Sequence, residues 1–478
     1  MKSQLKILLI NPPYTNFEGM KESGGHMLSL GLAYVAAFLR SRTNDQIEIL
    51  DTEVEGLNYG QIKDRIKKAK ADVCGLTCPT PTMAHVGRLV KLIKEILPAS
   101  QTVLGGIHPS VMPEQSLRET GADFAIFGEG EITFYELIES FKQNQPEFSK
   151  IAGLAWRSGE KITINEPRRL IQSLDDLPFP ARDLFNLPLY YSAPTKKVSE
   201  ENATPILTSR GCPFNCIHCC SRVVWRGQLR FRSAQNVLAE IEECIKKYNL
   251  KEFNFFDDTF TVNRERVMEI CQGLIDRRLN ISWICFSRAN TIDQELIKIM
   301  EQAGCKKISF GLESGSQEIL NLMRKNTTLQ MAHQAVQIVA ENNIAVHASF
   351  MLGNVGETEE TIKETIKFAK SLPLDNATFF ITSPFPGTDL YTIAKQIGSI
   401  NSRTRWEEFA PLTNTSPILV QKNVSKERLV YWQKRAFREF YLRPKYIKRK
   451  LRLLASRDGI KTLLEGLRIL IRILFKKS

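Results

Sequence analysis

Residues 205–220 read Pro-Ile-Leu-Thr-Ser-Arg-Gly-Cys-Pro-Phe-Asn-Cys-Ile-His-Cys-Cys, and this stretch decides how the rest of the chain is interpreted. Its first four residues form an apolar run typical of a buried strand. Cys212, Cys216 and Cys219 follow on a loop that also contains glycine and proline. Three closely spaced thiolates can hold three irons of a cubane cluster and leave the fourth iron open to a ligand that is not protein. The spacing therefore favours an iron–sulfur centre, with these three cysteines as metal ligands, at the carboxyl end of a strand.

A zinc site and a set of buried, unligated cysteines are the alternatives. Structural zinc normally takes four ligands, and His218 could be the fourth only if the loop folded back sharply between Cys216 and Cys219. The chain begins with an apolar run too short for a secretory signal, followed at once by Asn11-Pro12-Pro13. We therefore expect a cytoplasmic protein, in which the ten cysteines are thiols or metal ligands rather than a disulfide framework.

Alternating strands and helices continue from the cysteine loop. Six strand–helix units predict a partial or open (β/α)6 barrel over residues 204–390, in which the chemistry gathers in the loops that follow the strands. From Leu390 onward the pattern is helical, so residues 391–478 are expected to form a C-terminal helical region. The predicted barrel strands are 205–208, 252–257, 282–288, 306–312, 345–352 and 377–381.

The first 145 residues show the same alternation and predict a separate α/β domain of the Rossmann-like type. Such a parallel, doubly wound sheet binds its ligand in the crevice at the carboxyl ends of its strands. Residues 146–203 are expected to be a hairpin, with its turn at 157–160, followed by a linker broken by prolines. The predicted strands of the first domain are 5–11, 46–51, 72–77, 101–104 and 123–127, and its predicted helices are 28–40, 61–70, 83–97 and 131–143.

In its cysteine triplet, placed at the start of six strand–helix units, the chain resembles the radical S-adenosylmethionine (SAM) superfamily. The motif of that superfamily is this cysteine triplet with an aromatic residue, here His218, before the third cysteine. The resemblance implies a [4Fe-4S] cluster whose open iron binds SAM through its amino and carboxylate groups. It also implies a 5′-deoxyadenosyl radical released on one-electron reduction, and an electron donor such as flavodoxin or ferredoxin.

The loops after the later strands resemble SAM-binding loops of the superfamily. Asp257 and Asp258 would lie near the SAM amino group, and the alternative is that Asp258 or Thr259 caps the helix that starts near Arg264. Glu313 would accept hydrogen bonds from the ribose hydroxyls. Arg288 would pair with a carboxylate of SAM or substrate, with a surface salt bridge as the alternative. The remaining candidates for SAM binding are Ser314, Gly356, Pro384 and Gly387, and Val355 departs from the proline usual before the Gly-Glu pair.

The first domain resembles the cobalamin-binding domain that precedes the barrel in one branch of the superfamily. Gly105 and Gly106 at a strand end would let a flat macrocycle or its nucleotide tail approach the backbone, and Thr77 would offer a hydroxyl from the neighbouring strand. Residues 11–19 contain no histidine, so we expect cobalamin to bind without a histidine ligand from this first loop. His108 could be an axial ligand, but a histidine beside a proline in a turn is more often structural. The segments that carry the resemblance are Asn11-Pro12-Pro13, Gly31-Leu32-Ala33-Tyr34, Leu76-Thr77-Cys78, Gly105 to Pro109 and Gly128-Glu129-Gly130-Glu131.

Positive charge is concentrated at the end of the chain. The net charge is +13, yet residues 421–478 hold 18 Lys and Arg against 4 Asp and Glu, which leaves 47 against 48 in the rest. A neutral body argues against a nucleic-acid partner. Residues 459–478 show apolar residues at helical spacing with basic residues on another face, which predicts a helix that lies on an anionic membrane or docks on the barrel. A membrane-bound helix would place the protein at the inner face of the membrane and favour a hydrophobic or lipid-like substrate.

The group that the chain resembles includes cobalamin-dependent radical SAM methyltransferases and the anaerobic magnesium-protoporphyrin monomethyl ester cyclase. The resemblance implies methylation of an unactivated carbon of a small molecule, with cobalamin as methyl carrier. A cobalamin-associated oxidoreductase or cyclase is the alternative enzyme. A non-catalytic iron–sulfur electron-transfer protein is the alternative from another class, and the SAM-binding loops speak against it.

Overall fold

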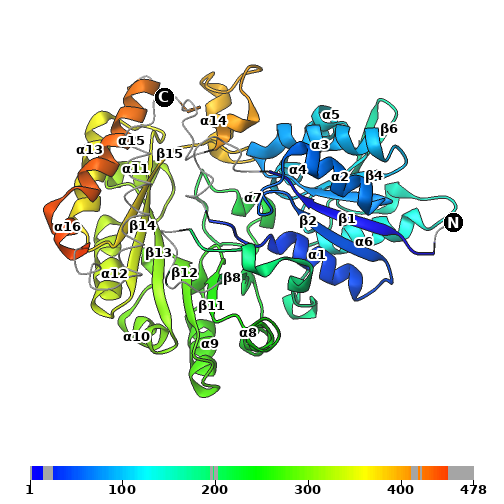
Figure 1. The fold of residues 1–478 in the computed structure, drawn as a ribbon. Helices are drawn as coiled ribbons and strands as arrows, with labels where there is room; N and C mark the ends of the chain where they lie inside the picture. The colour runs from blue at the N-terminus through cyan, green and yellow to red at the C-terminus, as the bar shows by residue number, and fades with distance from the viewer. Residues whose placement is uncertain are drawn as a thin grey trace.

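The structure is a computed structural model that describes residues 3–13, 25–193, 198, 203–410, 418–419 and 423–450. Two α/β halves lie side by side, the N-terminal one in blue and cyan and the C-terminal one in green to orange (Figure 1). The first half contains a seven-stranded sheet of order β2-β1-β3-β4-β5-β6-β7, parallel from β2 to β5 and antiparallel at β6 and β7. Its strands are β1 (Lys6–Asn11), β2 (Gln46–Asp51), β3 (Val73–Thr77), β4 (Gln101–Gly105), β5 (Phe124–Ile126), β6 (Leu154–Ser158) and β7 (Lys161–Ile164).

Helices cover both faces of this sheet. Leu9 and Val103 pack towards α1 and α6, whereas Leu8 and Leu104 pack towards α2, α3 and α5. Successive strand residues point to opposite faces, so strands buried on both sides consist of continuous apolar runs. The predicted doubly wound domain is confirmed. The helices are α1 (Leu30–Arg40), α2 (Tyr59–Ala69), α3 (Met83–Ile96), α4 (Ile107–Val111), α5 (Pro113–Thr120) and α6 (Gly130–Phe141).

Residues 146–193 are more closely packed than a linker. The predicted hairpin is present, and its strand β6 pairs with β5 and so extends the first sheet. Short 3-10 turns follow, and their apolar side chains join the core beneath α1 and α6. This part of the chain therefore belongs structurally to the first half. The buried side chains it contributes are Leu174, Leu177, Ala181, Phe185 and Tyr190.

The second half contains a six-stranded parallel sheet of order β15-β14-β13-β12-β11-β8, the predicted partial barrel. One face of the strands packs against helices through residues such as Phe255, Phe310 and Phe350. The strands are β8 (Ala203–Ile206), β11 (Glu252–Phe255), β12 (Ser282–Ser287), β13 (Cys305–Glu313), β14 (Ala345–Leu352) and β15 (Asn376–Ile381). The helices are α8 (Ala234–Tyr248), α9 (Arg264–Asp276), α10 (Gln294–Gln302), α11 (Gln317–Leu322), α12 (Leu329–Glu341) and α13 (Glu359–Ser371).

The end of the chain is helical where it is described. α14 (Asp389–Gln396), α15 (Lys426–Tyr441) and α16 (Pro444–Lys450) follow the barrel. α15 packs on β15, where the Gln433 side-chain amide donates to the Phe379 carbonyl (2.9 Å). The predicted basic helix 459–478 lies outside the described residues. Within the described ranges no helix is long and apolar enough to cross a membrane.

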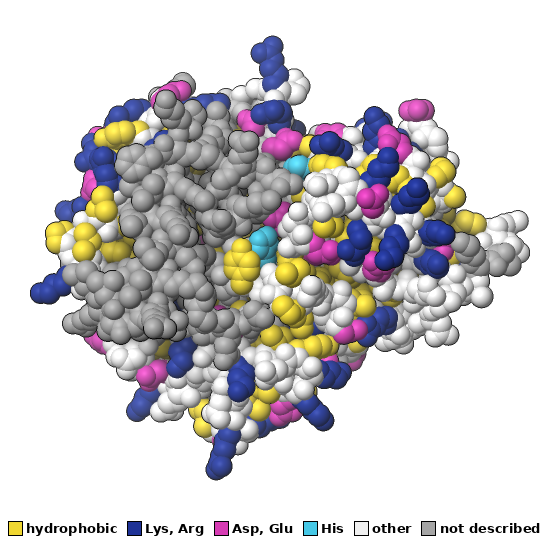
Figure 2. Space-filling model, in the orientation of Figure 1, with side chains coloured by type: hydrophobic (Ala, Val, Ile, Leu, Met, Phe, Trp, Pro, Cys, Tyr) yellow, Lys and Arg dark blue, Asp and Glu magenta, His cyan; other side chains and the backbone are white. Residues whose placement is uncertain are grey.

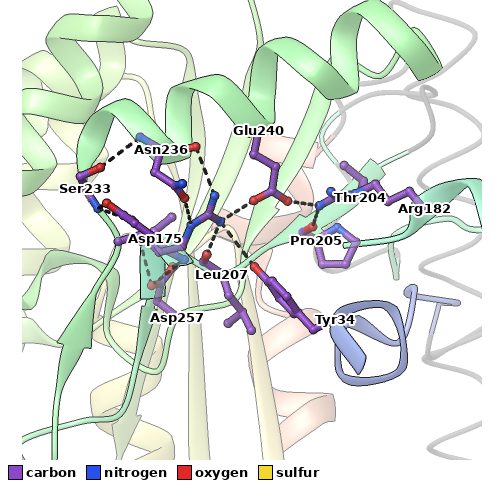
Figure 3. A network of polar contacts seen from close by, with 12 residues as sticks. Tyr34, Asp175, Arg182, Thr204, Pro205, Leu207, Ser233, Asn236, Glu240 and Asp257 are labelled. Carbon is purple, nitrogen blue, oxygen red and sulfur yellow. Dashed lines mark hydrogen bonds and ion pairs between the residues drawn. The ribbon is translucent and has the colours of Figure 1, made fainter. Parts of the chain in front are cut away.

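A buried charge network joins the two halves (Figure 3). Glu240 on α8 lies between Arg182 and Arg232, with 2.6 Å from its Oε1 to the Arg182 Nη2. Burial alone would raise the pKa of Glu240, but the two guanidinium groups hold it below its usual value. The same arginines donate to backbone carbonyls of the first barrel strand and the residue after it, Pro205 (2.8 Å) and Leu207 (2.9 Å).

Changing Glu240 to Gln is expected to destabilise the protein by about 3–5 kcal/mol, because two buried guanidinium groups lose their counter-charge. The control is Glu243→Gln on the same helix, whose pair with Lys247 is partly exposed and should change stability by less than about 1 kcal/mol. Urea unfolding of both variants measures the difference. Equal midpoints for the two variants would contradict the predicted cost.

Candidate active site where the carboxyl ends of the two sheets meet

The cysteine loop leaves the barrel at a turn that only glycine can form. The strand pair β9 (Ser209–Arg210) and β10 (Arg230–Phe231) brackets the loop, so that its two ends are hydrogen-bonded to each other. Gly211 has φ +105°, and a Cβ there would lie 1.9 Å from the Gln228 carbonyl oxygen. A side chain at this position would break the turn. The residue before Cys212 is therefore held rigidly relative to β10.

The three predicted cluster ligands lie together on this loop. The Cys219 amide donates to the Cys216 carbonyl (3.2 Å), which places both thiols on one turn, and the Cys212 Sγ lies 3.7 Å from the Thr259 hydroxyl. All three are free thiols. In the described part of the chain no three His, Cys, Asp or Glu side chains converge as ligands of a single metal ion would. The three cysteines stay the predicted ligands of a cubane cluster, in which each thiolate would bind its own iron.

Two partly buried groups of the cysteine loop, Cys219 and His218, have altered pKa values. Burial raises the pKa of the Cys219 thiol to about 12, so the thiolate needs a bound cation to form near neutral pH. Burial also lowers the pKa of His218 to about 4, and its Nδ1 has no hydrogen-bond partner among the described residues. His218 is thus a neutral ring packed behind the cysteines.

Asp257 and Asp258 follow β11 and support the cysteine loop. The buried Asp257 carboxylate accepts hydrogen bonds from the Thr208 amide (3.1 Å), the Thr208 hydroxyl (2.9 Å) and the Ser209 hydroxyl. Asp258 accepts from the Ser221 hydroxyl at 2.6 Å, just after the last cysteine. The helix-cap alternative is wrong, because the side chain that caps α9 is Asn263.

Arg288 points at the cysteine loop rather than at solvent. It is 5% exposed, its Nη1 lies 3.3 Å from the Cys216 Sγ, and its guanidinium lies 3.8 Å from the centre of the Phe214 ring. It also donates to the Lys325 carbonyl. The surface salt bridge is therefore wrong for this residue. Arg288 is instead a hydrogen-bond donor to the Cys216 sulfur inside the cysteine loop.

Glu313 ends β13 in a left-handed backbone conformation, with φ +66°. Its buried carboxylate is paired with Lys325 (2.9 Å), a residue that sequence reasoning missed. Burial alone would raise the pKa of Glu313, but Lys325 holds it below its usual value. A Cβ on Gly311 would lie 2.3 Å from the Glu313 Oε1, so the carboxylate lies folded over bare backbone. Unusual backbone angles of this kind concentrate at functional sites.

The other predicted SAM-binding residues organise neighbouring loops. The Ser314 hydroxyl contacts the Thr365 hydroxyl on α13 (3.1 Å). Gly356 has φ +78° in a loop built by the buried Glu357, whose carboxylate accepts from the Gly353 and Asn354 amides (3.1 Å each). The loop therefore closes with Val355 at the position where the resemblance led us to expect a proline.

The loop after β15 brings the first half into the site. It contains Pro384 and Gly387, and a Cβ on Gly387 would lie 2.9 Å from Val111 of α4 and 3.1 Å from Val223 of α7 (Ser221–Trp225). The carboxyl edges of the two sheets therefore touch through this loop, beside the cysteines.

The predicted cobalamin-binding residues lie at the carboxyl edge of the first sheet. Thr77 ends β3 and Gly105 ends β4, and the two are register partners. Apart from its chain neighbours, no atom of the described residues lies within 4 Å of a Cβ placed on Gly105, whereas Gly106 has φ +100° and a Cβ there would approach the Thr77 hydroxyl to 3.1 Å. The bare backbone and free space at Gly105 fit the close approach of a flat macrocycle.

His108 is fully buried behind this edge. Its Nδ1 lies 3.1 Å from the Thr80 hydroxyl, its ring meets Trp406 edge-on at 4.6 Å, and its Nε2 has no hydrogen-bond partner in the described ranges. Burial lowers the pKa of His108 to about 4. These contacts are those expected of a structural histidine.

Stability is expected to depend on the protonation of His108. The unfolded chain binds this proton below about pH 6.5, whereas the folded protein resists it down to about pH 4. Stability is therefore fully present above pH 6.5 and is lost as the pH falls towards 4, by about 2 kcal/mol at pH 5. His108→Gln should remove this contribution, so its urea midpoint should fall less than that of the wild type between pH 7 and pH 5. Parallel pH profiles would contradict the burial argument.

Comparisons with known proteins agree with this geometry. The B12 binding domain model matches residues 19–138, and the radical SAM superfamily model matches residues 206–369. An uncharacterized methyltransferase of Pyrococcus horikoshii is 34% identical over 93% of this chain and 94% of its own length. The anaerobic magnesium-protoporphyrin IX monomethyl ester cyclase of Rubrivivax gelatinosus is 27% identical over 93% of this chain and 78% of its own.

Two solved structures share the fold. TsrM, a radical SAM methyltransferase from Kitasatospora setae, has a TM-score of 0.69 at 18% identity and covers 82% of this chain and 76% of its own. The cobalamin-dependent SAM radical enzyme OxsB has a TM-score of 0.65 at 19% identity and covers 90% and 61%. Given the relative in Pyrococcus and the two adjacent domain matches, this chain belongs to the radical SAM enzymes that carry a cobalamin-binding domain.

Proposed function

We propose that this enzyme methylates an unactivated carbon of a small-molecule substrate, using a [4Fe-4S] cluster, SAM and cobalamin. The observation that carries the proposal is the contact between the two carboxyl edges, where the loop of Gly387 meets α4 beside the cysteines. One edge offers three thiols and the other offers bare backbone at Gly105. Together the cluster, SAM and cobalamin would supply a carbon-centred radical and a transferable methyl group.

The chain would hold and orient these groups with the predicted residues. Cys212, Cys216 and Cys219 would ligate the cluster. Glu313 would accept hydrogen bonds from the ribose hydroxyls of SAM, since Lys325 keeps the Glu313 carboxylate charged and in place. The further residues proposed around SAM are Asp257, Asp258, Arg288, Ser314, Gly356, Pro384 and Gly387, and those proposed around cobalamin are Thr77, Gly105, Gly106 and His108.

The buried surroundings suit radical chemistry. Asp257, Arg288 and Glu313 are each less than 10% exposed. Water kept away from a reactive radical cannot quench it by side reactions. The chain's own contribution is therefore orientation and exclusion of solvent around the reacting groups.

An oxidoreductase or cyclase without methyl transfer is the second candidate, because a cyclase matches 93% of this chain. Anaerobic reconstitution with iron, sulfide and hydroxocobalamin, followed by SAM, reductant and cell extract, separates the two. Formation of both 5′-deoxyadenosine and S-adenosylhomocysteine supports methyl transfer, and 5′-deoxyadenosine alone supports the second candidate. If neither product forms, the proposed function is wrong. Flavodoxin and ferredoxin are the electron donors to try in place of a chemical reductant.

Residues 459–478 add a proposal about location. Their basic amphipathic pattern suits an anionic membrane surface at the inner face of the membrane, where a hydrophobic or lipid-like substrate would be available. The mixed acidic and basic surface of the first half offers no comparable single-sign patch on the face shown (Figure 2). Deleting residues 459–478 should abolish binding to liposomes that contain anionic lipid, and unchanged binding would remove this proposal.

A further inference from the structure

A second buried charge network links the cobalamin-binding half directly to the cysteine loop. The two carboxylates of the Gly128-Glu129-Gly130-Glu131 stretch, after β5, meet two arginines of the barrel half. Arg210 donates from Nη1 to Glu129 and from Nη2 to Glu131, both at 2.6 Å. Arg230 donates from Nη1 to Glu129 at 2.9 Å. All four side chains are at most 7% exposed, so the pairs are shielded from solvent and salt.

The two arginines stand at the two ends of the cysteine loop. Arg210 lies two residues before Cys212, and Arg230 is its register partner across the short strand pair β9–β10 that closes the loop. Gly211, between Arg210 and Cys212, packs so closely against the chain just before β10 that a Cβ there would lie 1.9 Å from the Gln228 carbonyl oxygen. Because a single residue separates Arg210 from Cys212, we expect a shift of Arg210 to move Cys212.

The carboxylates stand at the edge proposed to bind cobalamin. They follow β5, the neighbour of β4, whose end is Gly105. Glu129 also accepts from the Ile171 amide at 2.7 Å, and the Arg210 guanidinium lies 5.1 Å from the Tyr34 ring centre, on α1. Glu129 is thus also held within the first half by the Ile171 amide, and the Arg210 guanidinium lies close to α1 of that half.

We propose that Glu129 and Glu131 are positioning residues: through Arg210 and Arg230 they hold both ends of the cysteine loop on the cobalamin edge and so set the separation between cluster and corrin. A planar guanidinium that bridges two carboxylates fixes direction as well as distance, which a lysine could not do. A misplacement of about 1 Å between reacting groups can cost roughly 100-fold in rate. The inference rests on the proposed function for its two cofactors.

The test uses the full chain and begins without cofactors. Hydrogen exchange of residues 207–232 in Glu129→Gln/Glu131→Gln is expected to quicken by about tenfold or more, because the loop ends lose their partners. The matched control is Asp45→Asn, which removes another buried carboxylate of the first half, paired with Lys142 at 2.8 Å. The control should leave exchange of residues 207–232 unchanged. Equal protection of these residues in the double variant and the wild type would overturn the proposal.

The second arm measures the separation of the cofactors. In wild-type protein that contains both the cluster and cobalamin, the reduced cluster should speed the magnetic relaxation of cob(II)alamin. All molecules should relax at the same rate. The double variant should be loaded to the same iron and cobalt content as the wild type. Its cob(II)alamin should then relax more slowly and over a range of rates, because the distance between the cofactors is no longer fixed. Asp45→Asn should keep the single rate, so mere loss of stability would not imitate the effect. If the double variant takes up too little iron or cobalt, the single variants Arg210→Lys and Glu131→Gln replace it in this measurement. A wild-type relaxation rate in those variants, once they contain both cofactors, would overturn the proposal.

The two arms separate this proposal from the proposed function. Wild type that takes up neither cofactor contradicts the function, and the exchange experiment still decides whether the carboxylates hold the loop. Wild type that takes up both, with variants that relax as it does, contradicts only the positioning role.

Discussion

Replacing Cys216 by alanine is expected to abolish the iron–sulfur cluster of the reconstituted enzyme and with it the formation of 5′-deoxyadenosine. Cys216 is the middle residue of the triplet and the most buried of the three, and Arg288 points an N–H at its sulfur from 3.3 Å. Loss of an outer partner of a metal ligand already costs 10–100-fold in affinity, so loss of the ligand itself should lower iron content by more than about tenfold. Iron and sulfide analysis and the visible absorbance of the cluster measure the change.

The chain offers a matched control next to the triplet. Cys220 is a free, half-buried thiol on the same loop and is outside the triplet. Cys220→Ala should retain iron, sulfide and absorbance. If Cys220→Ala lost the cluster while Cys216→Ala kept it, the ligand assignment would move to Cys220.

The second large effect is expected at Gly105. The Cβ of a leucine there would meet no atom of the described residues beyond its chain neighbours, so we expect the domain to fold, yet the side chain would fill the space in which cobalamin is proposed to lie. The reconstituted Gly105→Leu variant is expected to keep its iron–sulfur cluster and to lose essentially all bound cobalamin. Cobalt analysis and corrin absorbance, with iron content measured on the same sample, test this.

The size of the side chain provides the control for this variant. Gly105→Ala adds one methyl group and should bind cobalamin more weakly than the wild type but better than Gly105→Leu. Unfolding midpoints should be similar for all three proteins, since no contact of the folded protein is lost. Full cobalamin content in Gly105→Leu would place the corrin elsewhere.

Much of the fold could be predicted because its signals are local. Each apolar run of the parallel strands stands between helices with their own 3.6-residue period, and the structure contains both sheets where these patterns predicted them. Residues 174–190 were expected to be linker because 3-10 turns and prolines carry no period. Their burial depends on a surface formed by α1 and α6, two helices that lie far from this segment in the chain.

The residues of the candidate site also fall into two groups: those that a local motif indicates and those that only the folded structure brings into the site. The cysteine triplet, Glu313 at the end of its strand and the Gly105-Gly106 pair stand out because spacing and residue type within a few positions carry the chemistry. Lys325 has no such motif, and it becomes a partner of Glu313 only when the turn after α11 folds back on β13. Arg288 could be expected to pair with a carboxylate, but only the structure shows it directed at the Cys216 sulfur.

By itself the sequence determined the two α/β halves and the three thiols at a strand end, since these follow from local periodicity and spacing. Only the tertiary structure decided which charged side chains pair with one another. Arg210 and Glu129 are 81 residues apart in the chain and 2.6 Å apart in space. No local pattern encodes that pairing, because a buried ion pair becomes favourable only when folding has brought both partners out of water together.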